Sequence, residues 1–429
     1  MIEVLVVVGP GVVADAGLLE EIAAREFAAA GVSGTLVHAR DASHVLSLLP
    51  PPSSPPPPPS SSPPPSSSEG AGCAVVLPGP SAEVRSLIGR DLGAVVWVDV
   101  ERADGVTAGE GATHLHGRGV GGLAWGIRHA VHRVRHPSRR IAYGPLPEQW
   151  GELYLPDADE PPVVMLIHGG YWRSIWAADI MGPLCADLTG RGFAVWNLEY
   201  RRPDLHGWDA TTADVALGLA ALATAALDLT RVTVVGHSAG AQLALRAVAD
   251  AAAGAASEAG GAQAAAGGAQ VPAAEARAAG GVRAAGARAE SAPAVDGARV
   301  VGGVRVGMVV SLAGVLDLVE GDRRWVGTGA VGAALGGRAP EGQVVTPPYA
   351  DASPLLRLPL GVRQLIVQGA ADDLDLVDFS RRYARAAQDA GDEVTYLEMP
   401  GDHFDVINPA TPIWQATAQA LVGDPGPRG

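Results

Sequence analysis

The chain has 429 residues, of which 31 are lysine or arginine and 46 are aspartate or glutamate, so its formal net charge is −15. This acidic balance argues against a dedicated nucleic-acid-binding protein, because neutralising phosphates requires a basic surface. The length exceeds that of one ordinary domain, and 48% of the residues are apolar, which is enough for more than one hydrophobic core.

Cys73 and Cys185 are the only cysteines, which excludes a disulfide framework and a cysteine metal cluster. The start of the chain carries Glu3 and no basic residue, so the apolar run Val4–Val8 predicts a strand rather than a signal peptide. No apolar run reaches the roughly 18 residues that a membrane helix needs. We therefore expect a cytoplasmic protein with neither a membrane nor a nucleic-acid partner.

Two segments have compositions that do not support a packed core. Residues 50–68 are almost entirely proline and serine, which predicts a disordered, extended loop. Residues 251–298 are mostly alanine and glycine, which predicts a disordered insertion, with a frayed surface helix as the alternative. Outside them, the chain divides into a domain over residues 1–140 and a larger one over residues 145–425.

In the first domain, short β-branched runs alternate with helical patterns, which is typical of a small, flavodoxin-like parallel α/β domain. Strands are expected at Val4–Val8, Thr35–His38, Ala74–Leu77 and Ala94–Val98, and helices at Gly17–Ala30 and Leu123–Val134.

The second domain repeats this alternation and predicts a doubly wound, mostly parallel sheet. Strands are expected at Val163–Ile167, Phe193–Asn197, Val232–Val235, Val306–Leu312, Gln364–Val367 and Val394–Leu397. Helices are expected at Ile180–Arg191, Thr211–Ala226, Ala241–Ala249 and Asp378–Ala390. Ligands of such a sheet bind beyond the carboxyl ends of its strands.

A Gly-x-Ser-x-Gly motif spans residues 236–240, directly after a predicted strand and at the start of a predicted helix. Small residues at its ends permit the tight, strained turn that lifts the hydroxyl of Ser238 above the sheet. The alternative is a glycine-rich structural turn.

A second glycine turn follows the strand Val163–Ile167. Gly169 and Gly170 let backbone N–H groups approach a substrate oxygen, and with the N–H of Ala239 they would form an oxyanion hole. Tyr171 and Trp172 come next and suggest that the substrate carries a flat or aromatic group, although aromatic side chains more often belong to the core. An ordinary turn is the alternative for the whole segment.

A serine hydroxyl needs a general base to become a nucleophile. His403 follows the last predicted strand, and Asp372 and Asp373 follow the strand before it. We prefer Asp372 as the acid that orients His403, with Asp373 as the alternative. His237, inside the serine motif, is expected to point away.

From about residue 145 to 420 the chain resembles an α/β-hydrolase, and more narrowly the kynurenine formamidase-like and small carboxylesterase-like branch. The resemblance implies Ser238 as nucleophile, His403 as base and Asp372 as its orienting acid, with no metal and no organic cofactor. One departure is Gln368, where these enzymes often have histidine. The segments that carry the resemblance are His168–Trp172, Asn197–Arg201, Gly236–Gly240 and His403–Ile407.

These roles predict a serine hydrolase that cleaves a small carboxylic ester, or an N-formyl or other amide, through an acyl-enzyme intermediate. The alternative from another class is a hydrolase fold that only binds a ligand or partner.

Residues 2–134 more loosely resemble a type II 3-dehydroquinate dehydratase. The similarity rests on residues 8–10, on Val95–Val98 and on the glycines between Gly117 and Gly122. The catalytic tyrosine and arginine loop of that family has no counterpart here, and Asp99 stands where a histidine is expected. We expect a degenerate, non-catalytic domain with a structural or homo-oligomerising role; a dehydratase fused to a hydrolase is the alternative.

The spacing Gly117-x-Gly119-x-x-Gly122 also matches a dinucleotide fingerprint, but residues 112–115 predict only a poor strand before it, so we do not expect nucleotide binding. Three histidines at helical spacing suggest a metal face. Neighbouring arginines oppose a bound cation, so a solvated basic helix end that leads into a linker at Arg139–Arg140 is the preferred interpretation. The histidines are His129, His132 and His136.

Overall fold

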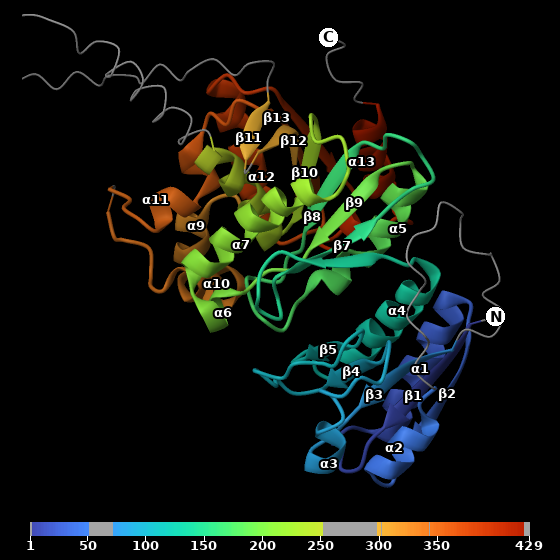
Figure 1. The fold of residues 1–429 in the computed structure, drawn as a ribbon. Helices are drawn as coiled ribbons and strands as arrows, with labels where there is room; N and C mark the ends of the chain where they lie inside the picture. Colours follow the sequence, from blue (N-terminus) through green and yellow to red (C-terminus); the bar gives the residue numbers. More distant parts are fainter. Residues whose placement is uncertain (1, 51–71, 252–297, 302, 343, 424–429) are drawn as a thin grey trace, which may run out of the picture.

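The structure is a computed structural model that describes residues 2–50, 72–251, 298–301, 303–342 and 344–423. The two low-complexity runs, expected to be disordered, lie outside the described residues except for their end positions. The described chain forms two sheets, one of five strands and one of nine, each flanked by helices (Figure 1).

The smaller sheet is parallel throughout, with strand order β2-β1-β3-β4-β5. This order is the flavodoxin-like one, and the expected fold class is confirmed. Its strands are β1 (Glu3–Val8), β2 (Ser33–His38), β3 (Gly72–Leu77), β4 (Val96–Asp99) and β5 (Thr113–His116). Its helices are α1 (Ala16–Ala30), α2 (Ala42–Leu48), α3 (Ala82–Arg85) and α4 (Gly122–Arg135).

The ends of α1 follow from single residues. The Asp15 side chain accepts a hydrogen bond from the N–H of Leu18 and caps the first turn. Gly31 ends the helix in the left-handed region, with φ of 61°, where its N–H reaches the last carbonyls. Valine-rich strands then pack against α1 and α4 on one face and against α2 and α3 on the other.

The larger sheet has the order β14-β13-β12-β10-β8-β9-β7-β6, with β11 paired to β12. The pairings of β6 with β7, of β7 with β9 and of β11 with β12 are antiparallel, and the other pairings are parallel. The strands are β6 (Arg139–Ala142), β7 (Trp150–Tyr154), β8 (Val163–Ile167), β9 (Ala194–Leu198), β10 (Val232–His237), β11 (Arg299–Val301), β12 (Val304–Leu312), β13 (Arg363–Gly369) and β14 (Val394–Met399). The expected doubly wound, mostly parallel sheet is therefore confirmed.

Helices cover both faces of this sheet. They are η1 (Ala178–Met181), α5 (Gly182–Gly190), α6 (Pro203–His206), α7 (Trp208–Ala220), η2 (Ala221–Thr224), a helix at 239–251, α9 (Leu318–Arg323), α10 (Val326–Leu335), α11 (Tyr349–Ala352), η4 (Pro354–Arg357), α12 (Leu374–Asp389), η5 (Asp405–Ile407) and α13 (Pro412–Val422). Two apolar clusters fill the space on either side, one around Trp196 and Phe379 and the other around Leu184 and Trp414. Within the described part of the chain, no helix is long and apolar enough to cross a membrane.

Three expectations about the region between the sheets are wrong. Arg139 and Arg140 are not a linker but part of β6, which pairs with β7. Residues 113–116 do form a strand, because pairing with β4 compensates for their polar sequence. Finally, α4 is not a solvated helix: His129 is 7% exposed, and the helix packs between its own sheet and η1 and α5 of the larger unit (Figure 1).

Candidate active site

Ser238 lies at the sharp turn between β10 and the helix at 239–251. Its φ is 54°, in the left-handed region that a non-glycine residue rarely adopts, and its side chain is almost fully buried. The Ser238 N–H donates to the carbonyl of Leu312 on β12 at 2.8 Å, which ties the turn to the sheet. A Cβ on Gly240 would overlap the carbonyls of Ile167 and His168, so only glycine fits there. This is the geometry of a nucleophile elbow.

The turn after β8 lies directly against Ser238. A Cβ on Gly169 would come within 2.7 Å of the His237 carbonyl and 2.8 Å of the Ser238 Cβ. Gly170, with φ of 118°, packs its backbone on Trp176. Ala239 is the first residue of the helix after the elbow, where backbone N–H groups have no acceptor within the helix. The structure thus places the three predicted oxyanion donors at the two turns that meet at Ser238.

His403 and Asp372 form a hydrogen-bonded pair on the loops after β14 and β13. The His403 Nδ1 lies 2.9 Å from the Asp372 Oδ2, and the side chains are 22% and 3% exposed. Asp373 instead caps α12 by accepting from the Asp375 N–H at 2.8 Å. Burial acts to raise the pKa of Asp372, but the hydrogen bond and charge of His403 outweigh it and hold the pKa below its usual value. Of the two alternatives, Asp372 is therefore the carboxylate in contact with His403.

Two further side chains, to which the sequence assigned no role in catalysis, contact this pair. The Gln368 amide donates to the Asp372 Oδ2 at 2.9 Å while its oxygen accepts from Ser380. The expectation that His237 points away is wrong, because its Nε2 lies 3.0 Å from the His403 carbonyl oxygen. Burial and the nearby His403 lower the pKa of His237 to about 3, so it is neutral and donates through Nε2.

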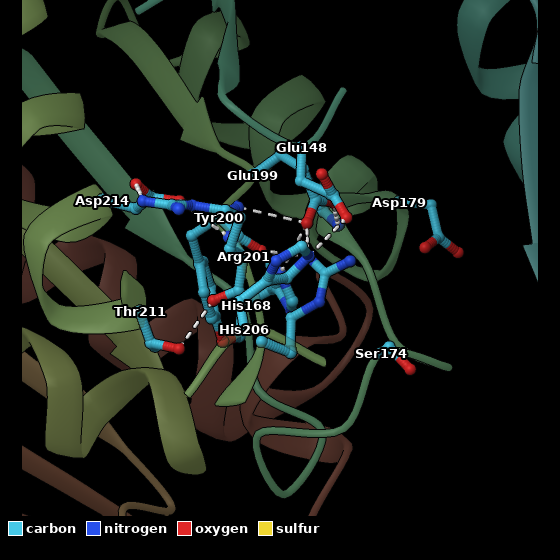
Figure 2. Close-up of polar contacts among 12 residues, drawn as sticks. Glu148, His168, Ser174, Asp179, Glu199, Tyr200, Arg201, His206, Thr211 and Asp214 are labelled. Carbon is cyan, nitrogen blue, oxygen red and sulfur yellow. Dashed lines mark hydrogen bonds and ion pairs between the residues drawn. The ribbon is translucent and has the colours of Figure 1, made fainter. Parts of the chain in front are cut away.

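A buried polar network lies beneath the glycine turn (Figure 2). The Tyr200 hydroxyl donates to the His168 carbonyl at 2.8 Å, and Glu199 accepts from the backbone N–H groups of Tyr200 and Ala178 at 3.1 and 2.8 Å. Arg202 pairs with Glu199 from the same loop. Burial and the charge of Arg202 lower the pKa of His168 to about 3, so the ion pair in this network is Arg202 with Glu199. The network fixes the backbone on both sides of the predicted oxyanion turn.

A second buried pair anchors the following loop. Asp214 accepts from the Arg201 guanidinium at 2.7 and 2.8 Å and from the Arg201 N–H at 3.0 Å (Figure 2). The Gln149 amide donates to the same carboxylate at 2.7 Å. These hydrogen bonds join the loop after β9, helix α7 and the residue before β7. They give residues 197–201, which belong to the segments that resemble α/β-hydrolases, a structural role.

The two aromatic residues after the glycine turn have different environments. Trp172 is 2% exposed and its indole N–H donates to Gln242 at 3.1 Å, which favours the core alternative for this residue; its contact with substrate stays a prediction. Tyr171 is half-buried and packs on Gly327. Burial, followed by the charges of Asp373 and Asp372, raises the pKa of Tyr171.

The smaller unit has a cavity of about 250 Å³ at the carboxyl ends of β3 and β4. The buried Asp99 lies in its wall and accepts from Arg85 at 2.7 and 3.0 Å and from His114 at 2.8 Å. Both oxygens of the Asp99 carboxylate are therefore hydrogen-bonded. The dehydratase resemblance is not tested by these contacts and stays a prediction.

The glycine-rich segment before α4 does follow a strand, so the reason given for dismissing it as a dinucleotide site was wrong. In the structure this loop is covered by the larger unit: a Cβ on Gly117 would lie 2.5 Å from the Ile175 side chain. Elsewhere, the described residues contain no group of three or more His, Cys, Asp or Glu side chains arranged to hold a metal ion.

Comparison with known proteins extends this picture. A sequence search of curated proteins finds no match. The family described as BD-FAE matches residues 152–263. A truncated carbohydrate esterase from gut microbiota superposes with a TM-score of 0.50 and 17% identity, over 67% of this chain and 95% of that one. The larger unit has the α/β-hydrolase fold.

Other solved structures similar to this α/β-hydrolase unit are more distant. The butyrate-bound esterase of the planctomycete Thermogutta terrifontis has a TM-score of 0.45 and 19% identity, over 68% of this chain and 96% of its own. A carboxyl esterase of the mycorrhizal fungus Tuber melanosporum has a TM-score of 0.46 and 16% identity, over 67% of this chain and 84% of its own.

Proposed function

We propose that the protein is a serine hydrolase that cleaves small carboxylic esters, with Ser238 as nucleophile, His403 as general base and Asp372 as the acid that orients the base. The observation that carries the proposal is a strained serine at a strand-to-helix turn, next to His237, whose ring contacts the loop of a His403–Asp372 pair with a 2.9 Å contact. A buried structural serine needs neither a left-handed φ nor such a pair.

In the proposed reaction, His403 Nε2 takes the Ser238 proton as the hydroxyl oxygen attacks the ester carbonyl carbon. The N–H groups of Gly169, Gly170 and Ala239 bind the resulting oxyanion. His403 then returns the proton to the alcohol oxygen as the acyl bond breaks, and Asp372 stabilises the transient imidazolium. Water, deprotonated by His403, releases the acid from Ser238 in the same way.

The similarity to a carbohydrate esterase supports an ester as the substrate class; an N-formyl or other amide is the alternative under the same mechanism. We place the protein in the cytoplasm, because Cys73 and Cys185 are buried free thiols.

The test is steady-state hydrolysis of p-nitrophenyl acetate and of an N-formyl arylamide by the wild type, Ser238→Ala and Ser81→Ala. Ser81 is a matched control because it also lies at a helix start, where it caps α3. We expect ester turnover that Ser238→Ala abolishes and Ser81→Ala leaves unchanged. Turnover that survives Ser238→Ala refutes the proposal, and faster turnover of the arylamide than of the ester assigns the amide class instead.

A further inference from the structure

The smaller unit holds the segment that follows the predicted oxyanion turn. Arg118, on the loop between β5 and α4, donates through Nε to the Ile175 carbonyl at 2.7 Å. Its two terminal nitrogens bind both oxygens of Asp179 at 2.6 and 2.7 Å. Both charged side chains are only 2% exposed. Arg118, which lies outside the hydrolase unit, therefore binds both residue 175 and residue 179.

A second arginine of the smaller unit reaches the same segment indirectly. Arg102 pairs with Asp204 at 2.9 Å. Asp204 in turn accepts from the Ser174 N–H at 3.0 and 3.1 Å and from the Ser174 hydroxyl at 3.0 Å. The segment 174–179, which begins four residues after Gly170, is thus held at both ends by the smaller unit.

An aromatic contact links the smaller unit to both sides of the candidate site. Trp125 on α4 meets Trp176 edge-to-face, with ring centroids 5.7 Å apart, and meets Phe404 at 6.2 Å. Trp176 packs on Gly170 of the oxyanion turn. Phe404 follows His403, and the two rings are 5.5 Å apart. A single side chain of α4 thus lies against the residues next to the oxyanion donors and next to the base.

These contacts are specific in a way that domain docking alone does not require. A buried, bidentate arginine–aspartate pair contributes little net stability, because desolvation offsets its attraction, but it fixes geometry closely. An apolar interface would join the units at least as firmly. The same guanidinium also donates through Nε to the backbone carbonyl of Ile175, and this second contact favours a positioning role over a docking role.

We propose that the smaller unit is a positioning element of the hydrolase site, with Arg118 and Trp125 as positioning residues for the oxyanion turn and for the His403 loop. Neither residue touches reacting atoms. The inference rests on the proposed function, because it assigns to the smaller unit a part in the same reaction. Displacing a catalytic group by about 1 Å costs on the order of 100-fold in rate, so a small loss of support is measurable.

The test compares full-length Trp125→Ala, Trp125→Phe, the double variant Arg118→Met with Asp179→Leu, and Arg128→Ala. Arg128 is the matched control, because it lies on the same helix with its guanidinium 5.5 Å from the Trp125 ring, but it pairs with Glu26 inside the smaller unit. The double variant avoids leaving a buried unpaired charge. Each variant is measured for kcat, KM and thermal unfolding, and for hydrogen exchange over residues 169–179 and 401–407.

We expect Trp125→Ala and the double variant to lower kcat by about 10- to 100-fold with KM changed by less than about threefold, and to speed exchange in both segments. Trp125→Phe should restore most of kcat, and Arg128→Ala should change kcat by less than about twofold even if its melting temperature falls. An unchanged kcat in folded Trp125→Ala and in the folded double variant overturns the proposal.

The two proposals fail differently. If the wild type shows no Ser238-dependent turnover, the proposed function fails, and the exchange rates alone decide whether the smaller unit orders the two segments. If the wild type turns over and the variants match it in rate and exchange, only the positioning role is wrong. A variant that does not fold leaves the decision to the others, and Trp125→Ala removes no charge.

Discussion

Replacing Asp372 by asparagine tests the most specific contact of the site. The buried Asp372 carboxylate faces the Nδ1 of His403 at 2.9 Å. If the imidazolium formed during the reaction lies roughly 4 Å from the carboxylate charge, their attraction is about 4 kcal/mol at an effective dielectric constant of about 20. That energy corresponds to a rate factor of about 10³. The amide also presents a donor or a neutral oxygen to Nδ1, which no longer stabilises the positive ring.

The assay is kcat for ester hydrolysis, with thermal unfolding recorded on the same samples. Asp373→Asn is the matched control, because asparagine is an equally good helix cap and Asp373 caps α12. We expect Asp372→Asn to lose about 10³-fold in kcat and Asp373→Asn to stay within about twofold. The reasoning is refuted if folded Asp372→Asn keeps more than a tenth of kcat, or if Asp373→Asn loses as much.

Three further outcomes follow from the same contacts. Gly169→Ala should lower kcat by at least about 100-fold, because the new methyl would collide with the Ser238 turn, whereas Gly190→Ala, with open space around it, should leave kcat unchanged. Gln368→Leu should lower kcat about tenfold by freeing Asp372, with KM unaffected, and equal changes in both constants would contradict this role. Acid should destabilise the protein: two buried histidines and one half-buried histidine have a pKa of about 3 when folded and about 6.5 when unfolded. Their stabilising effect is therefore complete above pH 6.5 and is lost as the pH falls towards 3. The free energy of unfolding from denaturant titrations should fall by up to about 4 kcal/mol per pH unit near pH 5, and a flat profile there would contradict the burial of these rings. They are His132, His168 and His237.

Much of the fold follows from sequence pattern alone. The strands predicted for both sheets are short runs rich in β-branched residues and bounded by glycine or polar residues, and β8 (Val163–Ile167) coincides with its predicted span. Such runs have few alternatives, because they can only be buried between two layers of helices. The order of Ser238, Asp372 and His403 was readable for the same reason, since each residue follows a recognisable strand.

The errors arise where a distant partner decides the environment. The end of α4 has a basic, polar sequence, but residues of the larger unit cover the helix and the loop before it: His132 on the helix contacts Tyr154, and Arg118 on the loop pairs with Asp179. Trp172 follows the glycine turn, and the sequence left open whether it contacts substrate or belongs to the core; its side chain is buried, and its φ of 55° is left-handed. Neither effect leaves a periodic signal in the sequence.

The sequence alone also could not decide which of the two neighbouring aspartates contacts His403. Asp372 and Asp373 are adjacent and chemically identical, and only the backbone of the loop after β13 decides which one faces His403. The support from Gln368 could not be predicted, because its amide contacts Asp372, four positions later in the chain, and such a loop contact has no sequence motif.

The central claim is that Ser238 is an activated nucleophile. The most direct measurement is the intact mass of the wild type and of Ser238→Ala after incubation with a fluorophosphonate, which reacts covalently with activated serines. The account predicts one adduct per chain on the wild type and none on the folded variant. A folded wild type that stays unlabelled, or a Ser238→Ala variant that still gains the adduct, would contradict it.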